Sequence, residues 1–189
     1  MTPFFSCRTG VQKETPTFEI IADTTKDRFR EIEFCALTAE MLNLKQISNG
    51  VENFELRVWT FKTGDKSKLY ILRRLDENWI GCNYTYSENA KLFIDSLRVN
   101  CQEVEGQKGM QLKSFLTQDS IKYLPSQASI PGFKDTFSDG AIYFVEISTQ
   151  TFYKVFGFRN PTEFDDHFNR SFVSLLDFIS SHSNIYQFN

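Results

Sequence analysis

The side chains able to do acid–base or metal chemistry are few, and the two histidines come first. His167 and His182 are fifteen residues apart in the last predicted helix, a distance of about 22 Å at 1.5 Å per residue, too far to share a metal ion. Glu163, Asp166 and His167 could meet across one helix turn, because residues three or four apart face each other. A capped, charged first turn explains them better, so the sequence predicts no metal site and no cofactor.

The four cysteines, Cys7, Cys35, Cys82 and Cys101, show neither a CxxC pair nor the Cys/His spacing of a zinc site. Cys35 and Cys82 fall in amphipathic or strand-like stretches, so we expect them to be small buried hydrophobic side chains. A Cys82–Cys101 disulfide is the alternative in an oxidising compartment. A chain of 189 residues does not need such a bond to fold.

Known catalytic motifs are missing from the sequence: it contains no GxSxG, HExxH, Walker or GxGxxG segment. No serine or cysteine has a recognisable base nearby. We therefore expect a protein that is not an enzyme. One enzymatic alternative remains, a carboxylate-dependent hydrolase that uses Asp135, Asp139 and Glu146 near the long loop at 126–139. A plain connection across the end of a sheet is the simpler interpretation of that loop.

Polar and aromatic side chains within predicted strands form the candidate binding surface. Arg57 and Glu146 could make a cross-strand pair if their strands share a sheet. Aromatic residues of several strands would join them on a surface opposite the terminal helix, suited to a peptide, a glycan or a partner protein. An ordinary solvated sheet face is the simpler alternative. The residues of this predicted surface are Arg57, Trp59, Tyr70, Tyr84, Tyr86, Tyr143, Glu146 and Tyr153.

Residues 54–86 must position most of these side chains. Phe54, Leu56 and Val58 alternate with polar or aromatic neighbours, the period of two that places side chains on opposite faces of a sheet. Turn-forming clusters at 63–66 and 76–78 separate three short strands. Because such short connections force neighbouring strands to be antiparallel, the sequence predicts a meander.

The last element is the clearest helix. Thr162 is the expected N-cap, followed by acidic residues in the first turn. The apolar stripe of this helix should dock on the sheet, where each buried side chain contributes roughly 1.5–3 kcal/mol. The stripe consists of Phe164, Phe168, Phe172, Leu175, Leu176 and Ile179.

The rest of the chain supplies further elements. Residues 28–37 fit either a helix or a strand, and we favour the helix. The predicted strands are at 18–22, within 91–104, and in a hairpin at 141–158; a turn is expected at 106–109 and a short helix at 115–124, ended by Pro125. We therefore predict one α+β domain over residues 18–189, with a twisted antiparallel sheet of about five to seven strands and the C-terminal helix packed on one face.

The charge and the aromatic content of the chain limit the classes of partner that it can bind. The net charge of −3 and the pI near 5.5 argue against nucleic-acid binding, which needs a basic surface. Aromatic residues make up 15% of the chain, and 20 of them are Phe, which favours an aromatic β core. No segment reaches the length of a membrane-spanning helix.

The first seven residues look like the end of a bacterial lipoprotein signal, with apolar Phe4 and Phe5, then Ser6, then Cys7. A basic n-region is missing and the apolar run is short. Residues 1–17 are therefore either a flexible tether or the remnant of a signal whose Cys7 carries a lipid anchor, and the sequence leaves both interpretations open.

Several segments together resemble a group of lipoproteins from Bacteroidota to which no activity is assigned. The matching segments are Phe5-Ser6-Cys7, the strand at 55–59, the Trp79 strand, 120–125, 139–146, Tyr153 and Asn160-Pro161. The resemblance implies a location in the cell envelope and supplies no catalytic residues. The chain departs from the group in its shortened signal.

We therefore expect a non-catalytic binding protein of the bacterial cell envelope, in the periplasm or at the outer membrane, touching the membrane only through a lipid on Cys7. A cytoplasmic location is the alternative. A second functional reading is an immunity or inhibitor protein that neutralises a toxin or an enzyme, a role suited to a small acidic domain. The hydrolase is the third.

Overall fold

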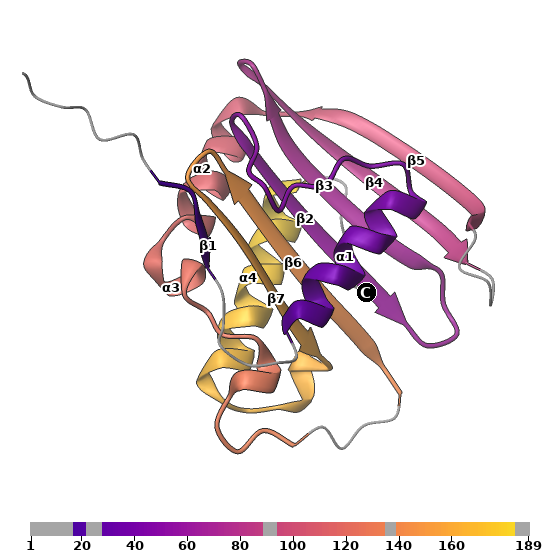
Figure 1. The fold of residues 1–189 in the computed structure, drawn as a ribbon, viewed down its shortest axis with the longest axis vertical. Coiled ribbons are helices and arrows are strands. Elements are labelled where there is room, and N and C mark those ends of the chain that lie inside the picture. Colours follow the sequence, from indigo (N-terminus) through magenta and orange to yellow (C-terminus); the bar gives the residue numbers. More distant parts are fainter. Residues whose placement is uncertain (1–16, 22–27, 89–93, 135–138, 184–189) are drawn as a thin grey trace, which may run out of the picture.

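The computed structural model describes residues 17–21, 28–88, 94–134 and 139–183, which form a seven-stranded sheet with helices on both faces (Figure 1). The strand order is β1-β7-β6-β2-β3-β4-β5. In chain order the strands and α-helices are β1 (Glu19–Ile21), α1 (Arg28–Met41), β2 (Phe54–Lys62), β3 (Ser67–Leu75), β4 (Asn78–Glu88), β5 (Ile94–Val104), α2 (Gly106–Leu116), α3 (Asp119–Lys122), β6 (Ala141–Thr149), β7 (Phe152–Arg159) and α4 (His167–Ser183). Two short 3₁₀ turns, Gln127–Ser129 and Pro161–Glu163, complete the set.

The predicted meander is confirmed, because β2, β3, β4 and β5 pair antiparallel in sequence order. The β2–β3 and β3–β4 turns use left-handed backbone, with φ of +79° at Gly64 and +53° at Asp76, conformations that glycine and aspartate tolerate best. The hairpin of β6 and β7 joins the meander through an antiparallel β2–β6 pair. The α+β class is therefore confirmed, with one difference. The short β1 pairs parallel to β7, so the sheet is mixed.

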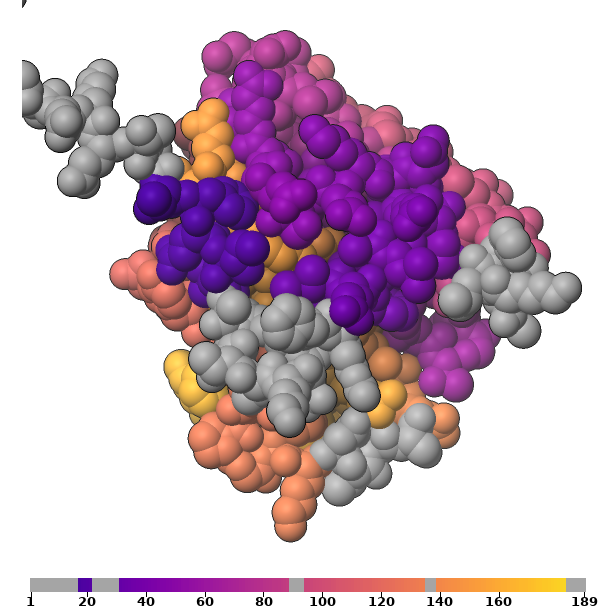
Figure 2. All heavy atoms as spheres, in the orientation of Figure 1, coloured from indigo at the N-terminus to yellow at the C-terminus, as the bar shows by residue number. Residues whose placement is uncertain are grey.

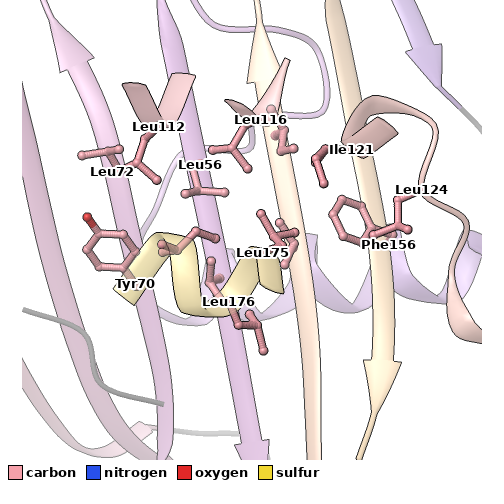
Figure 3. Packing of buried hydrophobic residues seen from close by; sticks show 14 of the residues in the cluster. Leu56, Tyr70, Leu72, Leu112, Leu116, Ile121, Leu124, Phe156, Leu175 and Leu176 are labelled. Atoms are coloured by element: carbon pink, nitrogen blue, oxygen red, sulfur yellow. The ribbon is translucent and has the colours of Figure 1, made fainter. Parts of the chain in front are cut away.

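The first core lies between the sheet and the helices α2, α3 and α4, as Figure 3 shows for its leucines and Phe156. Phe172 of α4 is fully buried and stacks on Phe158, with ring centroids 4.2 Å apart, while Phe156 meets it edge-on at 5.9 Å. The predicted docking of the terminal helix on the sheet is therefore confirmed.

The start of α4 differs from the prediction. Asp166, not Thr162, caps the helix: its Oδ1 accepts the backbone N–H groups of Phe168 at 2.9 Å and Asn169 at 3.0 Å. Asn160 has a φ of +45° and leads into the 3₁₀ turn of Pro161–Glu163, which delays the helix by one turn. Phe164 consequently precedes α4 and is not part of its stripe.

The predicted turn at 106–109 is wrong, because these residues begin α2. Gly109, Leu112 and Leu116 are spaced three and four residues apart and face the core. A Cβ at Gly109 would lie 2.3 Å from the ring of Trp79. Glycine is therefore required here for close packing of helix on strand rather than for turn formation.

The second core lies on the opposite face, under α1, which confirms the helical interpretation of residues 28–37. The small side chains of Cys35 and Ala39 are almost fully buried against the sheet. Small residues allow a helix backbone to approach a sheet closely. Figure 2 shows the purple atoms of α1 and of the segment that follows it spread over much of this face.

Cys82 and Cys101 form a disulfide between directly opposite residues of β4 and β5, with Cα atoms 4.0 Å apart. This is the alternative that the sequence left open, and it accounts for the buried position of Cys82. Within the described residues Cys35 is a free, buried thiol. Cys7 and residues 1–16 of the predicted tether lie outside the described residues.

Reduction of this disulfide is expected to lower the free energy of unfolding by about 2–4 kcal/mol, because the bond closes a loop between residues 19 positions apart. Urea unfolding with and without a dithiol reductant measures the effect. A chain with both Cys82→Ser and Cys101→Ser should unfold at the reduced midpoint in either condition. An unchanged midpoint on reduction of the wild-type chain would contradict the pairing.

No helix among the described residues combines the length and apolarity needed to span a membrane.

Candidate functional site

A group of buried polar side chains lies under α1 and centres on Glu146 of β6. Trp59 of β2 donates its indole N–H to Glu146 Oε2 at 2.7 Å, and the Tyr153 hydroxyl of β7 donates to Oε1 at 2.8 Å. All three side chains are at least 95% buried. Together with Arg57 and Glu55 they are called the Glu146 cluster below.

Arg57 lies directly opposite Glu146 in the β2–β6 register, as the sequence suggested. The hydrogen bonds of its guanidinium go elsewhere, however. The Nε donates to Glu55 Oε1 at 2.8 Å, and a terminal nitrogen donates to the backbone carbonyl of Lys45 at 2.5 Å. Arg57 therefore acts on Glu146 through charge, while Glu55 and the segment after α1 hold it in place.

Burial is the largest influence on the acid–base behaviour of this cluster. It raises the pKa of the Glu146 carboxyl, and the Arg57 charge and the bonds from Trp59 and Tyr153 offset this only partly. Burial also raises the pKa of the Cys35 thiol. A shifted carboxyl of this kind can serve as a general acid or base where a substrate reaches it.

In this structure a substrate cannot reach the Glu146 carboxyl to use it as a general acid or base. The cavity beside Glu146, lined also by Cys35 and Ala39, has a volume of about 10 Å³, close to the minimum for one water molecule. Both carboxylate oxygens already accept hydrogen bonds. With α1 in place the Glu146 cluster is a satisfied internal network that fixes β2, β6 and β7 relative to one another.

The predicted binding surface is not a single exposed face. Tyr70 and Tyr143 point into the core under α4, and the Tyr143 ring lies 6.1 Å from that of Phe172. Trp59, Tyr86 and Tyr153 are buried on the other face, and Tyr84 packs beside them. The prediction of one solvent-facing surface is therefore corrected, because α1 covers the face that it assigned to solvent.

The carboxylates of the hydrolase alternative are not brought together. Asp139 is exposed just before β6, whereas Glu146 is buried near the middle of that strand. Glu146 lies five positions beyond Ala141, the first residue of β6, roughly 16 Å along the strand at about 3.3 Å per residue, and Asp139 precedes the strand. Asp135 lies outside the described residues. Nor do any three His, Cys, Asp or Glu side chains of the described part gather closely enough to hold a metal ion.

The accessible feature that sequence reasoning missed is the outer edge of β5. Among the described residues, this eleven-residue strand pairs with β4 on one side and ends the sheet on the other (Figure 1). Every residue from Leu97 to Glu103 is exposed, including the apolar Leu97 and Val99. The alternation of Leu97, Val99 and Cys101 signalled a strand, but a single sequence does not tell which strands end a sheet.

The register with β4 determines which backbone N–H and C=O groups of β5 point outward from the sheet. A Cα separation of 4.0 Å between Cys82 and Cys101 corresponds to the closely spaced, non-hydrogen-bonded type of antiparallel pair. Cys101 and the residues two and four positions before it, Val99 and Leu97, therefore direct their N–H and C=O groups away from β4. The open edge offers these groups to a further strand.

Comparison of the chain with protein-family models, with curated proteins and with solved structures finds no match.

Proposed function

We propose that this chain is a non-catalytic interaction protein of the bacterial cell envelope that binds an extended segment of a partner protein along β5. The open edge of β5 is the observation that carries the proposal. Strands at a sheet edge bind peptides by continuing the backbone ladder, with side-chain neighbours adding specificity. Natural proteins usually shorten or block such an edge, as the three-residue β1 does at the opposite end of this sheet.

The two faces of β5 indicate the character of the bound segment. Leu97 and Val99 project on the α1 side of the sheet, and Arg98 and Asn100 project on the α4 side, as their partners across β4 require. A segment that alternates apolar residues with acidic or amide residues would match both rows. Arg98 favours an acidic residue opposite it.

The disulfide supports both parts of the proposal. It ties β5 to β4 at Cys101, so the edge is held in one register before a partner arrives, which lowers the entropic cost of binding. Disulfides persist in oxidising compartments such as the periplasm, and this favours the envelope over the cytoplasmic alternative. A lipid anchor on Cys7 belongs to the same proposal and would place the domain at a membrane surface.

The substitution Val99→Pro tests strand addition. Proline removes an N–H group that points away from β4, so the β4–β5 ladder keeps its bonds while the partner loses one. With a photo-crosslinking amino acid at Leu97 of the full chain in bacterial cells, we expect a crosslinked protein adduct that Val99→Pro reduces at least tenfold. Val99→Thr, which keeps the N–H group, should preserve the adduct.

Three outcomes would count against the proposal. The first is the absence of an adduct from Leu97. The second is an adduct that Val99→Pro leaves unchanged, because contact would then not depend on the strand edge. The third is free thiols at Cys82 and Cys101 in chains trapped by alkylation in cells, which would contradict an oxidising location. An adduct with a toxin or an enzyme would favour the immunity or inhibitor reading at the same edge.

A further inference from the structure

A groove lies between α3 and the first two turns of α4. Its volume is about 460 Å³, within the range of small-ligand sites in proteins. The floor is apolar and consists of Phe115, Ile121, Leu124 and Phe168, which belong to the core under α4 or pack against it. The floor is therefore part of the rigid body of the domain.

The α4 wall of the groove is a polar stripe. His167, Arg170, Ser171 and Ser174 are spaced three, four and seven residues from the first, so they share one face of the helix. This face lies beside the apolar stripe that docks on the sheet. Both serines offer a hydroxyl that can donate and accept.

The α3 wall adds acceptors and an aromatic ring. Asp119 and Ser120 stand at its start, and Tyr123 follows one turn later. Tyr123 is 56% exposed, although it is a large aromatic residue. The Lys122 ammonium lies 5.2 Å from the centroid of this ring and also pairs with Glu19 at 3.2 Å, so the cation helps to hold the ring in place.

The groove lining carries one charge of each sign, Asp119 and Arg170, which narrows the ligand chemistry. Arg170 is already paired with Asp165, and Asp119 faces the groove as a carboxylate. An anionic ligand would meet Asp119, and a cationic ligand would meet Arg170. A neutral ligand with many hydroxyl groups can instead donate to Asp119 and accept from Arg170 and the serines. Its C–H face can cover an aromatic ring, whose apolar surface is otherwise exposed to water.

We propose that this groove, bounded by Tyr123 and the His167–Ser174 face of α4, binds a neutral saccharide of one or two rings. The Tyr123 ring takes the apolar face of the sugar, and Asp119, Arg170 and Ser174 take its hydroxyl groups. The site is separate from the β5 edge and does not depend on it.

Titration of the ¹⁵N-labelled full chain with maltose, cellobiose and N,N′-diacetylchitobiose tests the proposal by NMR. At least one of the three should bind with a Kd of about 1 mM or tighter. It should shift amide resonances of residues 119–125 and 167–174 while leaving β5 unchanged. The Tyr123→Ala variant should raise that Kd at least tenfold, and Tyr123→Trp, which keeps an aromatic platform, should retain binding.

Two matched controls make the result specific to the groove. Met110→Ala removes another exposed apolar side chain outside the groove and should leave the Kd unchanged. Val99→Pro should also leave it unchanged, so failure of the β5 proposal and failure of this one are distinguishable. The saccharide assignment is overturned if none of the three sugars shifts these resonances at about 20 mM, a concentration well above the expected Kd. It is also overturned if Tyr123→Ala leaves the shifts intact, or if the apolar dye 1-anilinonaphthalene-8-sulfonate binds the groove and no sugar does.

Discussion

Replacement of Glu146 by alanine is expected to lower the free energy of unfolding by about 3–5 kcal/mol. The change removes the acceptor of two buried donors, the Trp59 indole N–H and the Tyr153 hydroxyl. Both groups would stay buried under α1 without a partner, and Arg57 would lose the negative charge opposite it. Because small domains have total stabilities of about 5–15 kcal/mol, the loss should be large in urea unfolding followed by circular dichroism.

Glu146→Gln is the matched control, because it keeps the shape and one acceptor but removes the titrating group. Burial raises the folded-state pKa of Glu146 above its ordinary value of 4.5. The folded chain therefore keeps this proton at pH values where the unfolded chain has released it. Stability should consequently fall as the pH rises from about 4.5 to the folded-state pKa, and then level off.

The two variants separate the structural role from the titration. Wild-type chain should show this decline in its unfolding midpoint on the alkaline side of about pH 4.5, and Glu146→Gln should lack that component. A Glu146→Ala chain as stable as wild type would show that the Trp59 and Tyr153 bonds contribute little. An identical pH profile for wild type and Glu146→Gln would show that this carboxyl titrates normally.

The elements that could be predicted are those in which local pattern and packing agree. Each of two patterns arises from packing against a single apolar surface, so its period is visible in the sequence. These patterns are the alternation in 54–86 and the helical stripe of Phe172, Leu175 and Ile179. The start of α4 was misplaced because Asp166 and Thr162 are both acceptable caps, and tertiary contacts of Asn160 and Pro161 decide between them. Local propensity therefore does not predict which of the two residues caps the helix.

The binding surface was misplaced for a different reason. The sequence shows that Trp59 and Glu146 alternate with core residues, and alternation in an antiparallel sheet usually means one buried and one wet face. Here α1 covers the second face, and its stripe is weak because its buried contacts come from small residues such as Cys35 and Ala39. Several residues of the predicted polar face are therefore buried in the Glu146 cluster. The accessible features are instead the β5 edge and the groove beside Tyr123.

The sequence left open both the pairing of Cys82 with Cys101 and the cellular compartment, and the disulfide bears on both questions. Pairing of Cys82 with Cys101 depends on β5 lying directly beside β4, and the pattern of 91–104 alone did not establish that arrangement. Once the register is known, the same bond supports the proposed oxidising compartment and fixes which backbone groups of β5 face outward. A single contact thus bears on both the location and the proposed mode of binding.

Phe172→Ala is expected to destabilise the chain by about 3–5 kcal/mol, through lost burial and the cavity left behind. The side chain is fully buried, stacked on Phe158 and edge-on to Phe156. Phe172→Leu should lower the free energy of unfolding markedly less, because leucine refills most of the volume. Asp177→Ala, on the exposed face of α4, should change it by less than about 0.5 kcal/mol. Urea unfolding of the three variants gives the order.

The same substitution separates the two proposed sites. Since α4 supplies one wall of the Tyr123 groove, loosening its packing should weaken saccharide binding under conditions where the chain remains folded. The β5 edge lies at the far end of the sheet from β7 and is tied to β4 by the disulfide, so the crosslink from Leu97 should persist. A Phe172→Ala chain that loses less than about 1 kcal/mol would mean that α4 does not depend on this contact. The sheet would then be held together mainly by its strand ladders and the Glu146 cluster.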